Sequence, residues 1–187
     1  MKHYIEIRLQ PDTEFSPHLL MNALFAKLHR GLVEWGGNRI GVSFPEHDEK
    51  KPTLGNRLRL HGSEQSLSEL MKHNWLNGMS SHIHVTGIQP IPAPEGYRRV
   101  RRVQAKSSPE RLRRRYMRRH SVDGECARQA IPDTARKTLA LPYVTIGSQS
   151  TGQRFRLFIE QGSIGDQPAE GRFNHYGLSV DATIPWF

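Results

Sequence analysis

Hydrophobic and polar residues alternate at the start of the chain. In HYIEIRL, residues 3–9, Ile5, Ile7 and Leu9 share one face, and polar or charged side chains occupy the other. A period of two is typical of a β-strand with one buried face. The first predicted element is therefore a strand, and RLRLHG at 57–62 predicts another by the same alternation.

A helical period replaces this alternation after residue 16. Ser16 followed by Pro17 is typical of a helix start, with an N-cap serine and proline in the first turn. Apolar or small residues then recur at helical spacing: Leu20, Leu24, Leu28, Gly31 and Trp35. The pattern predicts a helix from residue 17 to about 35, ended by Gly36.

Three shorter apolar segments complete the first half of the chain. IGVSF at 40–44 predicts a strand, residues 66–71 predict a short helix capped by Ser63 or Ser66, and SHIHVTGI at 81–88 predicts a fourth strand. The resulting order is β-α-β-β-α-β. This order is typical of the ferredoxin-like arrangement, an antiparallel sheet with two helices on one face.

QPIPAPEG, at 89–96, has three prolines and predicts a linker. We therefore expect an α+β protein with an N-terminal ferredoxin-like domain over 1–94 and a C-terminal α+β domain over 95–187. In the second domain we expect a helix over 108–120, a short helix near 123–130, and β-like stretches at 141–146, 153–160 and 172–179. GSQSTG, at 147–152, predicts a turn between the first two of these stretches.

The composition is typical of a soluble globular protein. Of 187 residues, 36% are hydrophobic and 24% charged. No apolar run approaches the roughly 18 residues of a membrane span. The first residues lack the apolar core of a signal peptide, and the single cysteine, Cys126, excludes an internal disulfide. We expect a cytoplasmic protein without a membrane partner.

The positive charge is concentrated in one segment. The net charge is +9, but residues 97–120 contain ten arginines and one lysine against a single acid, Glu110. The rest of the chain has 16 basic and 17 acidic residues, so the whole excess lies in 97–120. A concentrated basic block indicates that the protein binds a polyanion.

The helix predicted over 108–120 carries most of this block on one face. At about 100° per residue, five of its six arginines fall within an arc of about 140°: Arg111, Arg114, Arg115, Arg118 and Arg119. Arginine favours phosphates and base edges, which its guanidinium binds through two hydrogen bonds. Nucleic acid is the favoured partner, and RNA fits best if one slim helix enters an opened hairpin groove. DNA and an acidic protein stay open as alternatives.

Candidate catalytic residues are less marked. His29 lies at the edge of the apolar stripe of the first helix, and Ser148, Ser150 and Thr151 lie in the small polar loop. RNA supplies its own nucleophile, the 2′-hydroxyl, so cleavage needs a group that transfers a proton and one that positions the 2′-oxygen. Histidine suits the first role and a serine hydroxyl the second.

The sequence pattern by itself is also explained by purely structural roles for these residues. It favours a surface or boundary histidine at His29, turn formers for the loop hydroxyls and a strand aromatic at Tyr176. His82 and His84 share a predicted strand face, but no third metal ligand follows from their spacing. The lack of a carboxylate cluster disfavours a metal-dependent nuclease, and we expect neither a metal nor a cofactor.

The sequence also resembles a known family along its whole length. It is similar to the repeat-specific CRISPR-RNA processing endoribonucleases of type I-F systems. The segments that carry the resemblance keep their order through the chain: HYIEIRL, LFAKLH, RIGVSFP, RVQAKS, PERLRRR, MRRH, SQSTGQ, FRLFI, YGLS and PWF.

The resemblance implies an activity and a partner. Such an enzyme binds the stem-loop of CRISPR repeat RNA and cleaves at the 3′ base of the hairpin without a metal. The 2′-hydroxyl attacks and leaves a 2′,3′-cyclic phosphate. The enzyme stays bound to its product and joins the other subunits of the type I-F surveillance complex. A non-catalytic RNA- or DNA-binding protein is the alternative.

The resemblance also implies roles for single residues. His29 and Ser148 match the catalytic histidine and serine, and Tyr176 matches a tyrosine that supports the catalytic site. Arg102 and Gln104 match residues that read bases, and Phe155 matches an aromatic that stacks on the terminal base pair.

The five arginines of the helix face match the helix that enters the groove, and we also assign Ser150 and Thr151 to RNA binding. Gly147 stands where a bulkier residue is expected, and Arg99 and Arg101 add positive charge beside Arg102.

Overall fold

The computed structural model describes residues 1–187 except 49, 105–108, 134–138 and 148–151. The chain folds into two compact units. The first contains residues 1–103 and 141–187, and the second contains residues 104–140. Each unit is described on its own, and the predicted domain division at residue 95 stays a prediction.

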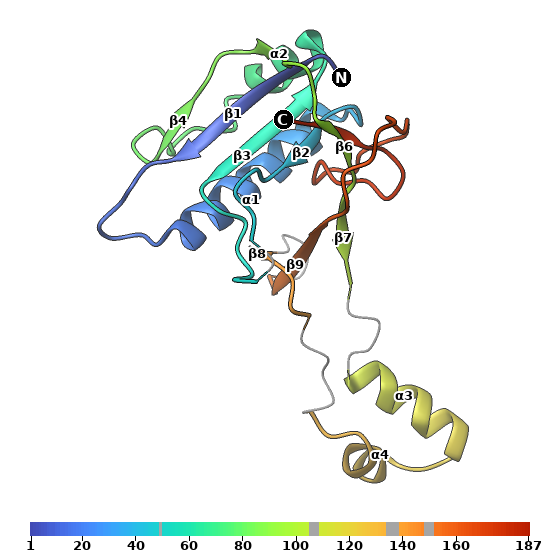
Figure 1. The fold of residues 1–187 in the computed structure, drawn as a ribbon. Helices are drawn as coiled ribbons and strands as arrows, with labels where there is room; N and C mark the ends of the chain where they lie inside the picture. Colours follow the sequence, from blue (N-terminus) through green and yellow to red (C-terminus); the bar gives the residue numbers. More distant parts are fainter. Residues whose placement is uncertain (49, 105–108, 134–138, 148–151) are drawn as a thin grey trace. The chain divides into compact units, whose positions relative to one another are not determined.

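The main sheet of the first unit is antiparallel and is built mostly from the N-terminal half of the chain (Figure 1). Its strands are β1 (His3–Leu9), β2 (Gly41–Ser43), β3 (Arg57–Gly62) and β4 (Ile83–Val85). They lie in the order β2-β3-β1-β4. The alternation in the sequence is confirmed, because Ile5, Ile7 and Leu9 are all buried.

Two helices supply the apolar side chains that pack with this sheet. α1 (Pro17–Trp35) begins at Ser16, whose Oγ accepts the Leu19 N–H, and ends at Gly36, which has a φ of 72°. α2 (Glu64–Lys72) begins at Ser63, whose side chain accepts the Ser66 N–H. The side chains of both helices join Ile5 and Ile7 in one core, so both helix predictions are confirmed.

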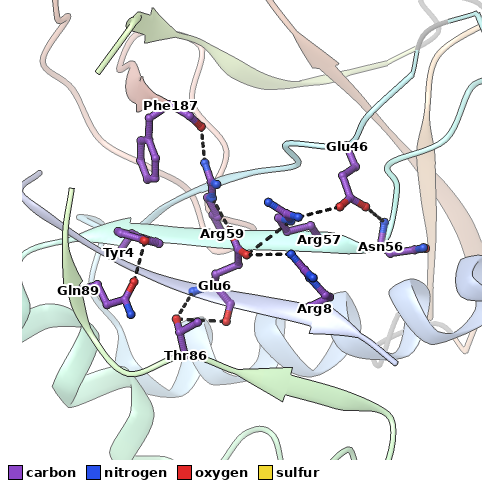
Figure 2. Close-up of polar contacts among 10 residues, drawn as sticks. All are labelled: Tyr4, Glu6, Arg8, Glu46, Asn56, Arg57, Arg59, Thr86, Gln89 and Phe187. Atoms are coloured by element: carbon purple, nitrogen blue, oxygen red, sulfur yellow. Dashed lines mark hydrogen bonds and ion pairs between the residues drawn. The ribbon is translucent and has the colours of Figure 1, made fainter. Parts of the chain in front are cut away.

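The polar side of the main sheet carries an ion-pair cluster that ties in the end of the chain (Figure 2). Glu6 on β1 pairs with Arg57 and Arg59 on β3, with Nε–O distances of 3.5 and 2.7 Å. The Arg59 guanidinium also donates to the Phe187 carbonyl oxygen and lies 4.2 Å from the Phe187 ring centre. Glu46 extends the cluster by pairing with Arg57. These contacts are structural, since they bind the sheet to Phe187.

The segment 89–96 is not the linker that its prolines predict. β5 (Gln89–Pro90) pairs with β1, and Gly96 begins β6 (Gly96–Arg98), which pairs with β10 (Ile184–Trp186). Pro90 has no N–H to donate, and proline is tolerated at such a sheet edge. The final residues pack into the fold, since Ile184 and Pro185 are buried.

A second antiparallel sheet lies in the same unit. Its strands β7 (Val100–Val103), β8 (Tyr143–Gly147) and β9 (Arg154–Gln161) are arranged in the order β7-β9-β8. The strands predicted at 141–146 and 153–160 are confirmed. The strand predicted at 172–179 is wrong, since this segment forms a turn and loop without strand pairing.

The second unit is helical where it is described. α3 (Pro109–His120) and α4 (Gly124–Ala130) pack against each other, and the Asp123 side chain caps α4 through the Cys126 N–H. The helix expected over 108–120 is confirmed from Pro109 onward. With helices and antiparallel sheets together, the protein belongs to the α+β class. No helix within the described residues is long and apolar enough to cross a membrane.

Candidate functional site

His29 is held in a defined orientation by a backbone carbonyl from a distant loop. It lies on α1, is half-buried, and its Nδ1 atom is 2.8 Å from the carbonyl oxygen of His175. A carbonyl oxygen only accepts, so Nδ1 carries the proton in this contact. In the neutral ring, Nε2 is then left with its lone pair free to accept a proton.

An aromatic ring fixes the plane of the His29 imidazole. The Tyr176 ring stacks on His29 with 4.1 Å between ring centres and an angle of 16° between planes. The Tyr176 ring also lies parallel to the buried Phe25 ring, with 6.4 Å between the ring centres. The structure therefore brings two of the predicted site residues, His29 and Tyr176, into direct contact.

The loop that carries Tyr176 is shaped by an asparagine and a glycine. The Asn174 Oδ1 atom accepts the N–H groups of Tyr176 and Leu178, at 2.8 and 3.2 Å. Gly177 has a φ of 70°, and its carbonyl oxygen accepts the Val42 N–H from β2. A short asparagine side chain that bonds its own backbone favours a turn over a strand. This is the physical reason why the strand predicted at 172–179 does not form.

Three contributors to this arrangement were not predicted from the sequence. These are the side chain of Asn174, the carbonyl of His175 and the positive φ of Gly177. Asn followed by Gly three residues later is a turn signal and could have identified the loop. Nothing in the sequence indicates that the His175 carbonyl faces His29, because 146 positions separate the two residues.

β8 packs against the side of α1 that carries His18 and Asn22, and His29 lies on the same side by helical phase. The Asn22 Oδ1 atom accepts the Thr145 N–H at 2.9 Å, and the His18 ring packs edge-on against Tyr143. Residue numbers rise in the same direction along both elements, so β8 advances along α1 toward His29. Its last residue, Gly147, is exposed, and a Cβ added there would meet no described atom within 4 Å. Ser148, Ser150 and Thr151 follow and lie outside the described residues.

Arg102 and Phe155 are neighbours on one face of the second sheet. The Arg102 Cζ atom lies 5.6 Å from the centre of the Phe155 ring. Both side chains are half-buried, and the Arg102 Nε atom is buried without a hydrogen-bond acceptor among the described residues. Gln104 is exposed at the start of the second unit. The extra arginine at position 101 forms a two-pronged ion pair with Glu160, so its charge is locally balanced.

The exposed face of α3 carries the five arginines that the helical phase predicts to lie together. These residues are all exposed: Arg111, Arg114, Arg115, Arg118 and Arg119. Leu112, Tyr116 and Met117 are half-buried. The sixth arginine, Arg113, pairs with Asp133 at 2.7 Å and donates to the Ile131 carbonyl oxygen. Like charges at three- and four-residue spacing repel one another, and a bound polyanion would relieve this repulsion.

The remaining candidate histidines have other surroundings. His82 pairs with Asp12 at 2.8 Å, while His84 is exposed on β4. In the described part of the chain, no three His, Cys, Asp or Glu side chains gather so that they could hold a metal ion.

Comparison with known proteins places this geometry in a family context. A family model described as "CRISPR-associated protein (Cas_Csy4)" matches residues 4–187. The chain is 54% identical over its full length to the CRISPR-associated endonuclease Cas6/Csy4 of Pseudomonas aeruginosa (strain UCBPP-PA14), and 44% identical to that of Escherichia coli (strain UTI89 / UPEC). Each of these alignments covers 100% of both chains.

A solved structure described as "An RAMP protein binding different RNA substrates" also matches, with 12% identity and a TM-score of 0.37. This match covers 98% of the present chain and 99% of the other.

Proposed function

The chain belongs to the Cas_Csy4 family of CRISPR-associated proteins, and from this membership we propose that it is an endoribonuclease that matures CRISPR RNA. It binds the stem-loop of the repeat and cleaves at the 3′ base of the hairpin. The 2′-hydroxyl of the RNA attacks the adjacent phosphorus, which gives a 2′,3′-cyclic phosphate, and no metal takes part. The two relatives of 54% and 44% identity are both named as endonucleases, which supports this proposal.

The observation that carries the catalytic part is the locked His29 ring. Because Nδ1 donates to the His175 carbonyl, Nε2 is the atom that transfers a proton, as general base or general acid. Tyr176 is a positioning residue that holds the ring plane by stacking. We assign Ser148 to orient the 2′-hydroxyl. The course of β8 along α1 toward His29 supports this, since β8 ends at Gly147, the residue before Ser148 in the sequence.

The proposed RNA contacts fall into three groups. The five exposed arginines of α3 bind phosphates in the groove of the stem. Arg102 and Gln104 read base edges, and Phe155 stacks on the terminal base pair; the Arg102–Phe155 contact supports a joint role at the base of the stem. Ser150 and Thr151 add contacts near the cut.

The family membership also supports finer assignments. The β2-β3-β1-β4 order with two helices supports a ferredoxin-like domain over 1–94, and we assign 95–187 to hairpin binding. After cleavage the enzyme stays on its product and contacts the other subunits of the type I-F surveillance complex.

His29→Ala tests the proposed mechanism. The variant should lose cleavage of the host's own repeat hairpin by at least about a hundredfold, because the proton-transfer group is gone. Hairpin affinity should stay near that of the wild type, since the imidazole is not among the proposed phosphate contacts. A 2′-deoxy nucleotide at the cut should block the wild type, and a chelator should leave the rate unchanged. Loss of activity in chelator would contradict the mechanism.

The alternative is a non-catalytic RNA- or DNA-binding protein. The arginine face of α3 fits it equally well, whereas the locked His29 has no role in it. Incubating the wild-type protein with its hairpin and sizing the RNA separates the two, because a binding protein leaves the RNA intact.

A further inference from the structure

A cluster of aromatic rings and arginines lies on one face of the β7-β9-β8 sheet. In the β8–β9 pairing, Tyr143 is opposite Phe158, and Thr145 is opposite Arg156. Side chains alternate along a strand, so these residues share a face. The intervening pair, Val144 and Leu157, is fully buried in the core. The Tyr143 face is therefore the side of the sheet turned away from that core.

The rings and the guanidinium of this cluster are already arranged for stacking. The Arg156 Cζ atom lies 4.6 Å from the centre of the Tyr143 ring. Phe158 and His18 contact Tyr143 edge-on, with ring centres 5.5 and 5.3 Å apart. His18 and Arg156 are exposed, and the other two residues are half-buried. Proteins that bind single-stranded nucleic acid stack its bases on partly accessible rings and bind its phosphates with neighbouring arginines.

The charge on this face favours a phosphate ligand. Arg101 on the neighbouring strand is neutralised by Glu160. Arg154 and Arg156 are both exposed, and neither forms an ion pair with another described residue. The face is thus positive as well as aromatic. An uncharged apolar partner would leave these guanidinium groups without counter-charge, which disfavours it.

The cluster lies on the same flank of α1 as His29. His18 and His29 are eleven residues apart, which places them about 20° apart around the helix and about 16 Å apart along it. Asn22, between them, holds β8 to this flank through the Thr145 N–H. A stacked strand that advances about 3.4 Å per nucleotide covers this distance in about five nucleotides.

We propose that His18, Tyr143, Arg156 and Phe158 bind the single-stranded RNA that continues 3′ from the cut. This inference rests on the proposed function, because it takes His29 as the position of the scissile phosphate. An RNA strand that leaves His29 and passes over β8, parallel to α1, would reach the cluster with its fourth to sixth nucleotides. The site would hold the precursor before cleavage and release the downstream piece afterwards.

The test compares the affinities of the wild-type protein for three RNAs with a 2′-deoxy nucleotide at the cut. They are a hairpin that ends just after the cut, the same hairpin with about eight extra nucleotides on the 3′ side, and one with the same extension on the 5′ side. The 3′ extension should raise affinity roughly tenfold. His18→Ala and Arg156→Ala should remove most of this gain while leaving the affinity for the short hairpin unchanged. Tyr143→Leu should act likewise, and its melting temperature should be recorded because the ring is half-buried.

Arg30→Ala is the matched control, since Arg30 is exposed on α1 about 120° around the helix from His18. It should keep the full gain. The proposal is overturned if the 3′ extension adds no affinity, if only the 5′ extension does, or if Arg30→Ala and Arg156→Ala behave alike. Cleavage of the all-ribose hairpin is measured in parallel and reports on the proposed function alone. A protein that cuts the hairpin but ignores the extension would retain that function and lose this site.

Discussion

The orientation of His29 depends on groups that are remote in the sequence. One backbone carbonyl fixes which ring nitrogen carries the proton, and one aromatic ring fixes the ring plane. Neither contact contributes a charge. The chemistry proposed for His29 thus depends on geometry, which a small displacement of the loop at 172–179 would disturb.

Tyr176 offers a direct test of this positioning. Tyr176→Phe keeps the stacked ring and should cleave at close to the wild-type rate. Tyr176→Ala removes the ring and should lower the single-turnover rate roughly ten- to a hundredfold, because a misplaced base loses alignment with the 2′-hydroxyl. Hairpin affinity should not change in either variant. Full activity of Tyr176→Ala, with an unaltered pH–rate profile, would show that the stack has no role in catalysis.

His61 differs from His29 because its side chain is fully buried in the folded protein. His61 on β3 is buried, and its Nε2 atom lies 2.8 Å from the Ser43 Oγ atom. Burial, with a smaller contribution from the neighbouring Arg59 charge, lowers the pKa of His61 from 6.5 to about 3. The folded protein therefore keeps this ring neutral at pH values at which the unfolded chain protonates it.

This difference makes the stability of the fold sensitive to acid. Because the folded pKa is the lower one, the contribution of His61 is complete above about pH 6.5 and is lost as the pH falls toward 3. Between pH 7 and pH 5 the loss in free energy of unfolding should be about 2 kcal/mol. Urea unfolding at both pH values, for the wild type and for His61→Gln, measures it.

The comparison with His61→Gln isolates one group among ten histidines. The variant should be less stable at pH 7 but should lose less stability on acidification. Equal losses in the two proteins would mean that His61 is protonated in the native state near pH 6.

At the scale of elements, α3 follows its helical phase closely. The three apolar residues of its inner side are half-buried and the five arginines of its outer side are exposed, as a period of 3.6 predicts. Arg113 departs from a purely phosphate-binding role, because its guanidinium anchors the residues that follow α4. One arginine thus stabilises the second unit while five remain on the face proposed for RNA.

The salt dependence of binding should distinguish these two roles. Arg118→Ala removes one proposed phosphate contact and should reduce the slope of log affinity against log salt by about one unit. Arg113→Ala removes a charge that Asp133 already balances and should change the slope less, while lowering the stability of the helical unit. Identical slopes in both variants would contradict the assignment of phosphate binding to Arg118 and of a structural role to Arg113.

At the scale of the whole molecule, the net charge of +9 describes one segment, and the rest of the chain is close to neutral. Electrostatic attraction alone would therefore bind any nucleic acid through residues 97–120. Under the proposed function, discrimination comes from the shape of the stem and from the contacts at its base.

The preference for RNA is testable at matched salt. The repeat hairpin as RNA should bind at least about tenfold more tightly than a DNA duplex of the same sequence at the same stated ionic strength. Competition titration of both ligands against one labelled hairpin provides the comparison. Equal affinities would favour the DNA-binding alternative.

Patterns within short windows determined a large part of this protein. Alternation placed β1 and β3, helical spacing with a serine cap placed α1, and the clustering of arginines identified α3 as the helix with a binding face. These features depend on neighbours a few residues apart, so the chain itself contains the information.

Only the tertiary structure decided the features that join distant segments. It paired 89–98 with β1 and β10, and it turned 172–179 into a loop because the Asn174 side chain and Gly177 favour a turn. It also brought His175 and Tyr176 to His29 across nearly 150 positions. Such contacts depend on how distant segments pack around a common core, and the local hydrophobic pattern of the sequence does not contain this information.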